Sequence, residues 1–520
     1  MHLENTHHID RRQALRAAVA GLAAAGGAAR AQHAPAPLMI VGPWEISGLA
    51  PVSSGYLFTR MQIAETLMGA HDDGRPAPAL AERWTVSDDG LEWRFYLRPT
   101  ARFHDGGQVT AEAVVSCLQA ARTPPALLGG APIEALSAEG PGTVLIRLSA
   151  RHAGLPARLA HSSTMVLAPA SRDADGRVVD IIGSGPYRLQ EVKAPQSVTA
   201  VRFDGYDGPR PAVGAVRYLT VSRSETRSLM AESGQADLAY GLDPISLARL
   251  RRRGRVHIES VTLPRTAIVK LNAGHPALRD VRVRRALSLA IDRAGIARAL
   301  LRDPDLAATQ LFAPTLAGWH DPALAPLRHD PEAAARLLAE AGWRRAADGL
   351  RDTGGQPLRL SLRSFVDRPE LPLIATALQE QWRQAGIAVE VQIGNSGDVP
   401  RGHRDGSLQL ALAARNYASV PDPTGTLLQD FGAPGGDWGA MGWSDPAVVQ
   451  SLAELSRGLA GAERTAVLRR RITTALQDGL PVIPVAWYRQ QVTVGPRLSG
   501  VTLDPLERSY RLTDMAWKTT

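Results

Sequence analysis

The stretch from residue 265 to residue 293 constrains the fold most strongly, because its hydrophobic period changes from that of a strand to that of a helix. Alternate apolar positions come first: Ala267, Val269 and Leu271. This alternation predicts a half-buried strand. Asp280 then stands at an N-cap position, ahead of apolar residues at helical spacing: Val283, Ala286, Leu287, Ala290 and Ile291. The segment therefore predicts a strand, a turn and a helix.

Four arginines lie mostly off the apolar stripe of that helix: Arg282, Arg284, Arg285 and Arg293. We interpret them as a solvated face. Across the chain, 59 basic and 51 acidic side chains give a net charge of +8, spread without a run of five or six basic residues. Nucleic-acid binding is therefore not expected.

Residues 1–33 have the pattern of an export signal. Arg11 and Arg12 precede an apolar run from Ala17 to Ala29, and a small-x-small cleavage site ends at Ala31. The arginine pair resembles a twin-arginine signal, and the ordinary secretory route stays open as an alternative. No later apolar run reaches the ~18 residues that a membrane span needs. We expect a soluble, periplasmic mature protein.

Cofactor and metal chemistry are not predicted. Cys117 is the single cysteine, lies in an apolar helical stretch and is expected to be a small core residue. Histidines are scattered, without the paired spacing that sets two imidazoles on one helical face. No nucleophile with its base and no phosphate-binding G-x-x-x-x-G-K-[ST] loop is visible. An exported hydrolase, the alternative from another class, lacks visible machinery.

Three motifs carry a family resemblance. From Asn272 to Arg293 the chain has N-x-x-x-P-x-L-R-D-x-R-V-R-R-A-L-x-x-A-I-D-R, from Trp84 it has W-x-x-S-x-D-G-x-x-W-x-F, and at 183–187 it has G-S-G-P-Y. These resemble family 5 solute-binding proteins, the extracytoplasmic receptors of ABC importers for dipeptides, oligopeptides, nickel complexes and opine-like compounds. The resemblance covers most of residues 38–515.

The resemblance implies an α/β fold: a two-lobed, type II periplasmic binding protein (Venus flytrap) with an extra inserted domain. Lobe I is expected at 38–78, 183–271 and 483–520, the inserted domain at 79–182 and lobe II at 272–482. The lobes are discontinuous because the C-terminal strand at 481–487 returns to the first lobe. A ligand would bind in the cleft between the lobes.

Two segments are candidates for that cleft. The first contributes Tyr56, Phe58 and Arg60, expected near the start of a helix, with simple packing as the alternative. The second, residues 413–427, contributes Arg415, Asn416, Tyr417 and Asp422. Arg415 either holds a ligand carboxylate bidentately or is a surface or salt-bridged residue.

Ser419 bears on the choice of ligand. The family's peptide receptors usually carry an acid at this place, three residues before Asp422, to pair the peptide amine. An unpaired buried ammonium costs ~3–5 kcal/mol, so a serine at position 419 disfavours ordinary dipeptide binding. The fragments L-F-A-P and D-G-x-R-D-x-x-G-Q-P-L most resemble the nickel-receptor branch, from which Pro421 departs by replacing an aromatic residue.

The resemblance predicts a monomeric receptor that performs no chemistry. It would capture a small peptide-like or carboxylate-rich ligand, an opine or metallophore such as a nickel chelate, and deliver it to permease and ATPase subunits of an ABC importer. An ordinary dipeptide or oligopeptide receptor is the alternative within the family. A receptor that serves a chemosensor instead of a permease is not separable by sequence.

Overall fold

The computed structural model describes residues 36–123, 127–347, 349–366, 368–418, 420–433, 435–458 and 460–519. The chain divides into two units, Met1–Pro37 and Leu38–Thr520, and the second holds the folded structure discussed below. The predicted export signal at 1–33 and Ser419 lie outside the described residues. None of the described helices is long and apolar enough to cross a membrane.

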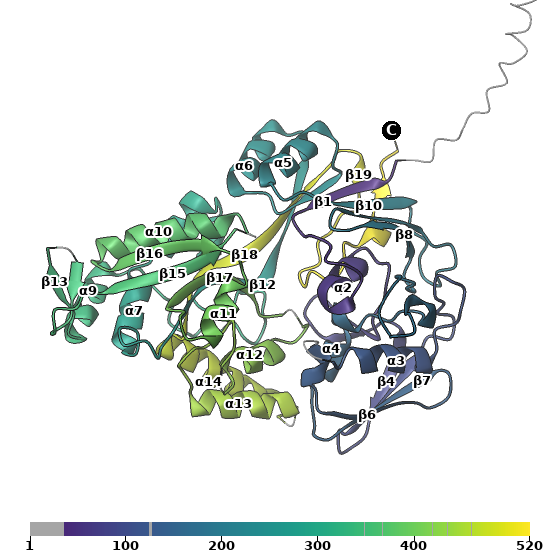
Figure 1. Cartoon of the computed structure of the whole chain (residues 1–520), viewed down its shortest axis with the longest axis horizontal. Coiled ribbons are helices and arrows are strands. Elements are labelled where there is room, and N and C mark those ends of the chain that lie inside the picture. Colours follow the sequence, from purple (N-terminus) through teal and green to yellow (C-terminus); the bar gives the residue numbers. More distant parts are fainter. Residues whose placement is uncertain are drawn as a thin grey trace, which may run out of the picture. The chain divides into compact units, whose positions relative to one another are not determined.

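A ten-stranded mixed sheet organises the second unit (Figure 1). Its strands, in order across the sheet, are β16 (Ala388–Gly394), β15 (Arg359–Phe365), β17 (Leu410–Asn416), β12 (His257–Leu271), β18 (Val482–Val494), β11 (Leu238–Tyr240), β1 (Leu38–Gly42), β10 (Ala215–Thr220), β9 (Ser197–Arg202) and β8 (Tyr187–Lys193). The 15-residue β12 and the 13-residue β18 are its longest strands and join the two halves.

The pairing of β12 with β18 contains a register shift, and this shift changes the surroundings of one side chain, that of Arg265. Antiparallel pairing runs from His257 to Leu263, then shifts before Thr266. Across this shift Arg265 pairs with β17 instead, opposite Asn416. Irregularities of this kind re-aim side chains, and this one lies where β12 passes from one half of the sheet to the other.

From Leu263 to Leu271, strand β12 is buried on both faces, which corrects the prediction of a half-buried strand. Val269 and the residues that alternate with it pack in one hydrophobic core, with Leu287 and Leu378. Ile268, on the opposite face, packs in a second core with Phe312 and Tyr417. Alternation alone could not show this, because it marks only one face of a strand that lies inside a sheet covered on both sides.

Smaller sheets accompany the large one. The order β4 (Ala81–Val86), β5 (Glu92–Leu97), β7 (Thr143–Leu148), β6 (Ile133–Ala138) forms a four-stranded antiparallel sheet. Gly90, with φ of +71°, turns the chain between β4 and β5, as the Asp-Asp-Gly sequence predicts. The two-stranded pairs are β2 (Met68–Ala70) with β3 (Pro76–Pro78), β13 (Arg344–Ala346) with β14 (Gly349–Arg351) and β19 (Leu498–Ser499) with β20 (Ala516–Trp517).

Helices cover the sheets: α2 (Pro51–Arg60), α3 (Ala111–Ala120), α4 (Leu155–Leu159), α5 (Ser224–Ser233), α6 (Pro244–Arg253), α7 (Val281–Leu289), α8 (Arg293–Gly295), α9 (Pro331–Glu340), α10 (Glu370–Gln384), α11 (Asp398–Arg404), α12 (Pro423–Phe431), α13 (Pro446–Arg457) and α14 (Ala462–Gly479). The predicted N-cap Asp280 is confirmed, since it accepts from the Arg282 amide of α7. Thr110 caps α3 in the same way, by accepting from the Ala113 amide. Cys117 is buried, as expected.

Two predictions about helices are wrong. Helix α2 begins at Pro51 and ends at Arg60, so Tyr56 and Arg60 lie toward its end and not near its start. Proline is favoured at the first helical position, and Gln62, with a left-handed φ of +55°, follows the end of the helix. The solvated-face interpretation fails for Arg284 and Arg293, which are 5% and 4% exposed. Both donate to backbone carbonyls of distant segments, which an amphipathic pattern does not reveal.

Candidate functional site

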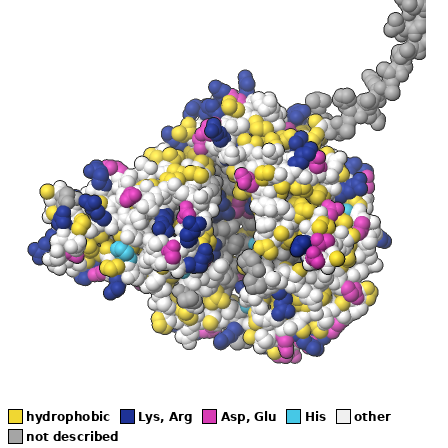
Figure 2. Space-filling view, viewed as in Figure 1, with side chains coloured by type: hydrophobic (Ala, Val, Ile, Leu, Met, Phe, Trp, Pro, Cys, Tyr) yellow, Lys and Arg dark blue, Asp and Glu magenta, His cyan; other side chains and the backbone are white. Residues whose placement is uncertain are grey.

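A cavity of about 570 Å³ lies where β12 and β17 approach the N-terminal and C-terminal segments of the unit. The molecular surface is hollowed near the centre of the view in Figure 2. The wall combines the end of α2, the residues after α4, the end of β17 and the segment 504–511. Residues separated by several hundred positions thus meet around one space.

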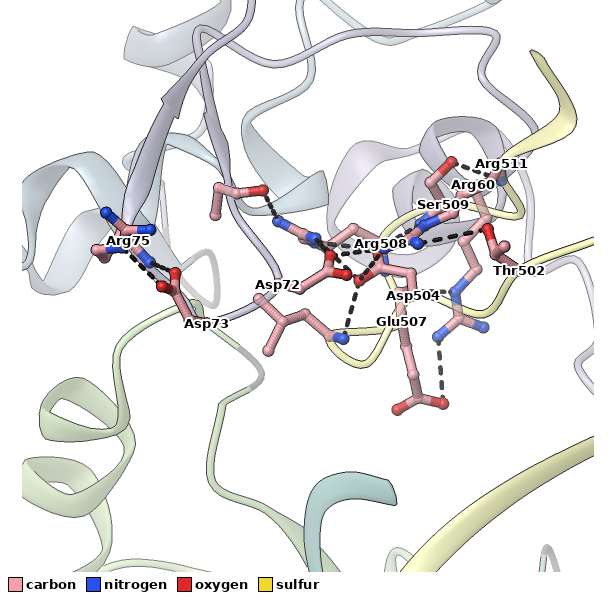
Figure 3. Close-up of polar contacts among 12 residues, drawn as sticks. Arg60, Asp72, Asp73, Arg75, Thr502, Asp504, Glu507, Arg508, Ser509 and Arg511 are labelled. Carbon is pink, nitrogen blue, oxygen red and sulfur yellow. Dashed lines mark hydrogen bonds and ion pairs between the residues drawn. The ribbon is translucent and has the colours of Figure 1, made fainter. Parts of the chain in front are cut away.

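Glu507 is an acid of this wall whose side chain is only 7% exposed. The Arg265 guanidinium donates to its carboxylate, with Nη2 2.5 Å from Oε2. Arg60 Nη2 lies 3.8 Å from Oε1, and Arg60 Nε donates to the Glu507 backbone carbonyl at 2.7 Å (Figure 3). Burial alone would raise the pKa of Glu507, but Arg265, Arg60 and Arg368 outweigh it and bring the pKa down to about 2. Glu507 is therefore ionised at neutral pH.

Arg265 retains hydrogen-bonding capacity. It is 6% exposed, and its Nε and Nη1 atoms have no hydrogen-bond partner among the described residues. Burial, together with repulsion from Arg368, lowers the pKa of Arg265 although Glu507 opposes the shift. A guanidinium in this state offers two donors and a desolvated positive charge to an anion.

A second, smaller cavity of about 90 Å³ adjoins Arg265 and Glu507 from the other side. Tyr488 lies in its wall between two guanidiniums, 5.1 Å from Arg265 and 5.2 Å from Arg368, measured to the ring centroid. Arg368 Nη1 also donates to the Tyr488 hydroxyl at 3.1 Å. Glu370 contributes a buried carboxylate oxygen, Oε1, without a partner among the described residues. The two cavities share Arg265 and Glu507 as a common wall.

The other arginines of the larger cavity have acidic partners. Arg508 donates to Asp504 at 2.9 Å and Arg511 to Asp72 at 2.5 Å, as drawn in Figure 3. Arg98 is paired in the same way with two carboxylates, Glu65 and Asp207. Glu507, in contrast, is shared by Arg60 and Arg265. The surplus positive charge is therefore concentrated around Glu507.

The structure brings three of the seven sequence-predicted ligand residues to the larger cavity: Tyr56, Arg60 and Asn416. Phe58 and Tyr417 are fully buried in hydrophobic cores. Asp422 accepts from the Thr424 amide as the N-cap of α12. These three side chains have packing and capping roles, and none is part of the cavity wall.

Arg415 takes the salt-bridge alternative. Its Nε and Nη2 atoms donate to the two carboxylate oxygens of Asp430, at 2.6 and 2.7 Å. The bidentate face that could have held a ligand carboxylate is thus occupied within the protein.

Sequence reasoning missed Arg265, Arg368 and Glu507. A charged residue at the start of a buried apolar strand was a usable signal for Arg265, because buried charges need a partner. Glu507 gave no comparable signal. Within the described part of the chain, no group of three or more His, Cys, Asp or Glu side chains is arranged to hold a metal ion.

Comparison with known proteins identifies the family. The chain belongs to the bacterial extracellular solute-binding proteins, family 5, whose middle region matches residues 75–438. The nickel-binding periplasmic protein of Escherichia coli K12 is 27% identical over 91% of this chain and 94% of its own. The dipeptide-binding protein of the same organism is 22% identical over 83% of this chain and 85% of its own.

A solved structure shows the same fold. The crystal structure of NikA from Brucella suis in complex with Fe(III)-EDTA matches with a TM-score of 0.85 and 24% identity, covering 93% of this chain and all of that one. The architecture is that of a two-lobed, type II periplasmic binding protein. The chain is accordingly a solute-binding receptor of an ABC importer, a binding protein that works with permease and ATPase components and performs no chemistry.

Proposed function

We propose that this receptor captures a small, carboxylate-rich ligand, either an opine-like amino dicarboxylate or a carboxylate chelate of a metal ion. The observation that carries the proposal is Arg265, a buried guanidinium with two unpartnered nitrogens in the wall of both cavities. Arg60 and Arg368 add positive charge around Glu507, a single carboxylate that already accepts a hydrogen bond from Arg265. A ligand carboxylate would complete the hydrogen bonds of Arg265 and balance this surplus charge.

Two lobes would close on this ligand. We assign lobe I to 38–78, 183–271 and 483–520, an inserted domain to 79–182 and lobe II to 272–482. The four-stranded sheet β4–β5–β7–β6 supports the inserted domain, because it is separate from the large sheet. Tyr56 and Arg60 would then meet the ligand from lobe I and Asn416 from lobe II. Taking the receptor from mostly open to mostly closed needs ~5 kcal/mol of differential affinity.

We further propose that residues 1–33 form a cleaved export signal and that the mature protein acts as a periplasmic monomer. The sequence pattern of Arg11 and Arg12 followed by an apolar run supports export. The twin-arginine and ordinary secretory routes both remain open. The Escherichia coli nickel-binding relative is a periplasmic protein, which agrees with the proposed location.

A zwitterionic peptide is the second candidate ligand, and Glu370 favours it. The unpartnered Oε1 of Glu370 lines the smaller cavity together with Arg265 and Arg368. This arrangement could pair an ammonium with the acid and a carboxylate with the arginines. Ser419, on which the sequence argument against peptides rested, lies outside the described residues.

Calorimetric titration of the mature protein tests the proposal. The ligands are amino dicarboxylates, Fe(III)-EDTA, nickel with and without histidine, and dipeptides. We expect R265Q to weaken carboxylate binding about 10- to 100-fold, because charge-assisted hydrogen bonds to a buried guanidinium are lost. R511Q is the matched control, since Arg511 lines the same cavity but is paired with Asp72. Tight binding that R265Q leaves unchanged would refute the assignment, and a dipeptide that binds best would favour the second candidate.

A further inference from the structure

The proposed inserted domain and lobe II are in contact away from strands β12 and β18. The Ala153 amide, just before α4, donates to the Ser456 carbonyl of α13 at 2.9 Å. Gly458, at the end of α13, faces Ala153 so closely that a methyl group added to Gly458 would lie 2.6 Å from the Ala153 Cβ. Figure 1 shows α4 on one side of this contact and α12 with α13 on the other.

The contact encloses polar groups from both sides. A cavity of about 30 Å³ is lined by His152, Gly154 and Arg158 on one side and by Asp422 and Ser456 on the other. Arg158 Nε lies 3.1 Å from His152 Nε2, and the Asp422 carboxylate attracts the Arg158 guanidinium across the boundary. The charges on the two sides are complementary.

This contact is coupled directly to the walls of the ligand cavity. Helix α4 is followed at once by Ala160–Ser162, which line the larger cavity. On the other side, Asn416, Ala418 and Pro421 line that cavity and lead into Asp422, the N-cap of α12. Separation of the two walls to admit a ligand must therefore break the contact between α4 and α13.

The contact is also built to be reversible. Ala153 is exposed although it touches Gly458, and among the described residues of the contact one backbone hydrogen bond, from the Ala153 amide to the Ser456 carbonyl, joins the two sides. The strongly buried hydrophobic clusters that hold β12 and β18 in place have no counterpart among these residues. Such a contact can form and break without unfolding either side.

We propose that Ala153, Gly154, Arg158, Asp422, Ser456 and Gly458 form a clasp, which stabilises the closed receptor and sets ligand affinity without touching the ligand. This inference rests on the proposed closure of two lobes. The residues act as positioning residues, because their effect reaches the ligand only through the distance between the cavity walls.

A steric block at Ala153 tests the clasp. Ala153→Trp adds an indole ring beside Gly458, where even one methyl group on Gly458 would lie 2.6 Å from the Ala153 Cβ, whereas Ala153→Ser adds a single oxygen atom. Nitroxide labels at Ala174 and Ala462, exposed positions in the inserted domain and in lobe II, report the distance between the two sides by pulsed electron resonance. The labels are read without ligand and with Fe(III)-EDTA. Affinity for the tightest ligand of the calorimetric panel and the melting temperature are measured on the same variants.

We expect the wild type and A153S to share a short-distance population that A153W loses. We also expect A153W to raise the Kd at least tenfold, through faster dissociation, with an unchanged melting temperature. A short-distance population that persists in A153W, or a wild type that lacks one, would overturn the clasp. If no ligand in the panel binds, the proposed function fails, while the label distances without ligand still decide whether the clasp exists.

Discussion

Arg415 and Asp430 form a bidentate ion pair, with Nε–Oδ2 and Nη2–Oδ1 distances of 2.6 and 2.7 Å. Asp430 is 1% exposed, and burial raises its pKa while Arg415 opposes the shift. We expect D430N to destabilise the protein by ~3–5 kcal/mol, because it leaves a guanidinium unpaired. R415Q should cost a similar amount, and the double variant less than the sum of the two. Denaturant unfolding of all three variants measures this coupling; additive effects would contradict it.

Glu507 forms ion pairs with both Arg265 and Arg60 and should contribute to stability as well as to the site. E507Q is expected to cost ~3–5 kcal/mol at neutral pH, because two buried guanidiniums lose their acid. The pKa of Glu507 is lowered from 4.5 to about 2, so its contribution is present above about 4.5 and is lost as pH falls through about 2. Urea unfolding as a function of pH, with exposed Glu390→Gln as control, checks this. Equal stability of E507Q and the wild type at pH 7 would be inconsistent with the pairing.

Arg284 and Arg282 are neighbours on α7 with opposite environments. Arg284 donates to the carbonyl of Gly479, at the end of α14, and to the carbonyls of Leu278 and Arg279, just before α7. It therefore ties these two segments together. We expect R284Q to destabilise by ~2–4 kcal/mol, since several buried carbonyls lose donors. R282Q removes a half-exposed pair with Asp280 and one hydrogen bond to the Glu340 carbonyl, so it should change the free energy of unfolding much less. Comparable losses in the two variants would show that Arg284 is not structural.

Lys270 should make stability depend on pH. It is 1% exposed and donates to Gly436 and Asp437 carbonyls, and burial lowers its pKa from 10.5 to about 7. Between these values the unfolded chain binds more protons, so the free energy of unfolding should rise with pH by up to ~1.4 kcal/mol per unit. K270M should lack this rise between pH 7 and about 9, whereas K193M, at an exposed lysine, should keep it. Parallel pH profiles for K270M and the wild type would exclude the effect.

Local patterns predicted most of the secondary structure, because caps and periodicity act between near neighbours. Asp280 was recognisable as an N-cap, since its signal lies within one turn of the helix that it starts. Helix α2 was misplaced because its start depends on Pro51, in a stretch whose glycine, serine and proline content is typical of loops. The family motifs extended these predictions to the two-lobed fold, and the comparisons confirm that fold.

The candidate site was predictable only in part. Tyr56, Arg60 and Asn416 line the larger cavity, whereas Arg415 is paired with Asp430 and Tyr417 is buried in a hydrophobic core. Whether a polar side chain at a strand end faces a ligand or a neighbour depends on what lies beside it in space. A sequence pattern carries no such information for residues far apart in the chain.

The sequence by itself determined the family and the order of many α and β elements, because these follow from local spacing and motif. Only the tertiary structure decided which charges meet. Arg265 and Glu507 are 242 residues apart, and they form an ion pair because two long strands cross between the lobes and the C-terminal segment returns beside them. Burial then forces such charges to find partners, and two nitrogens of Arg265 have none among the described residues, which supports the proposed contact with a ligand.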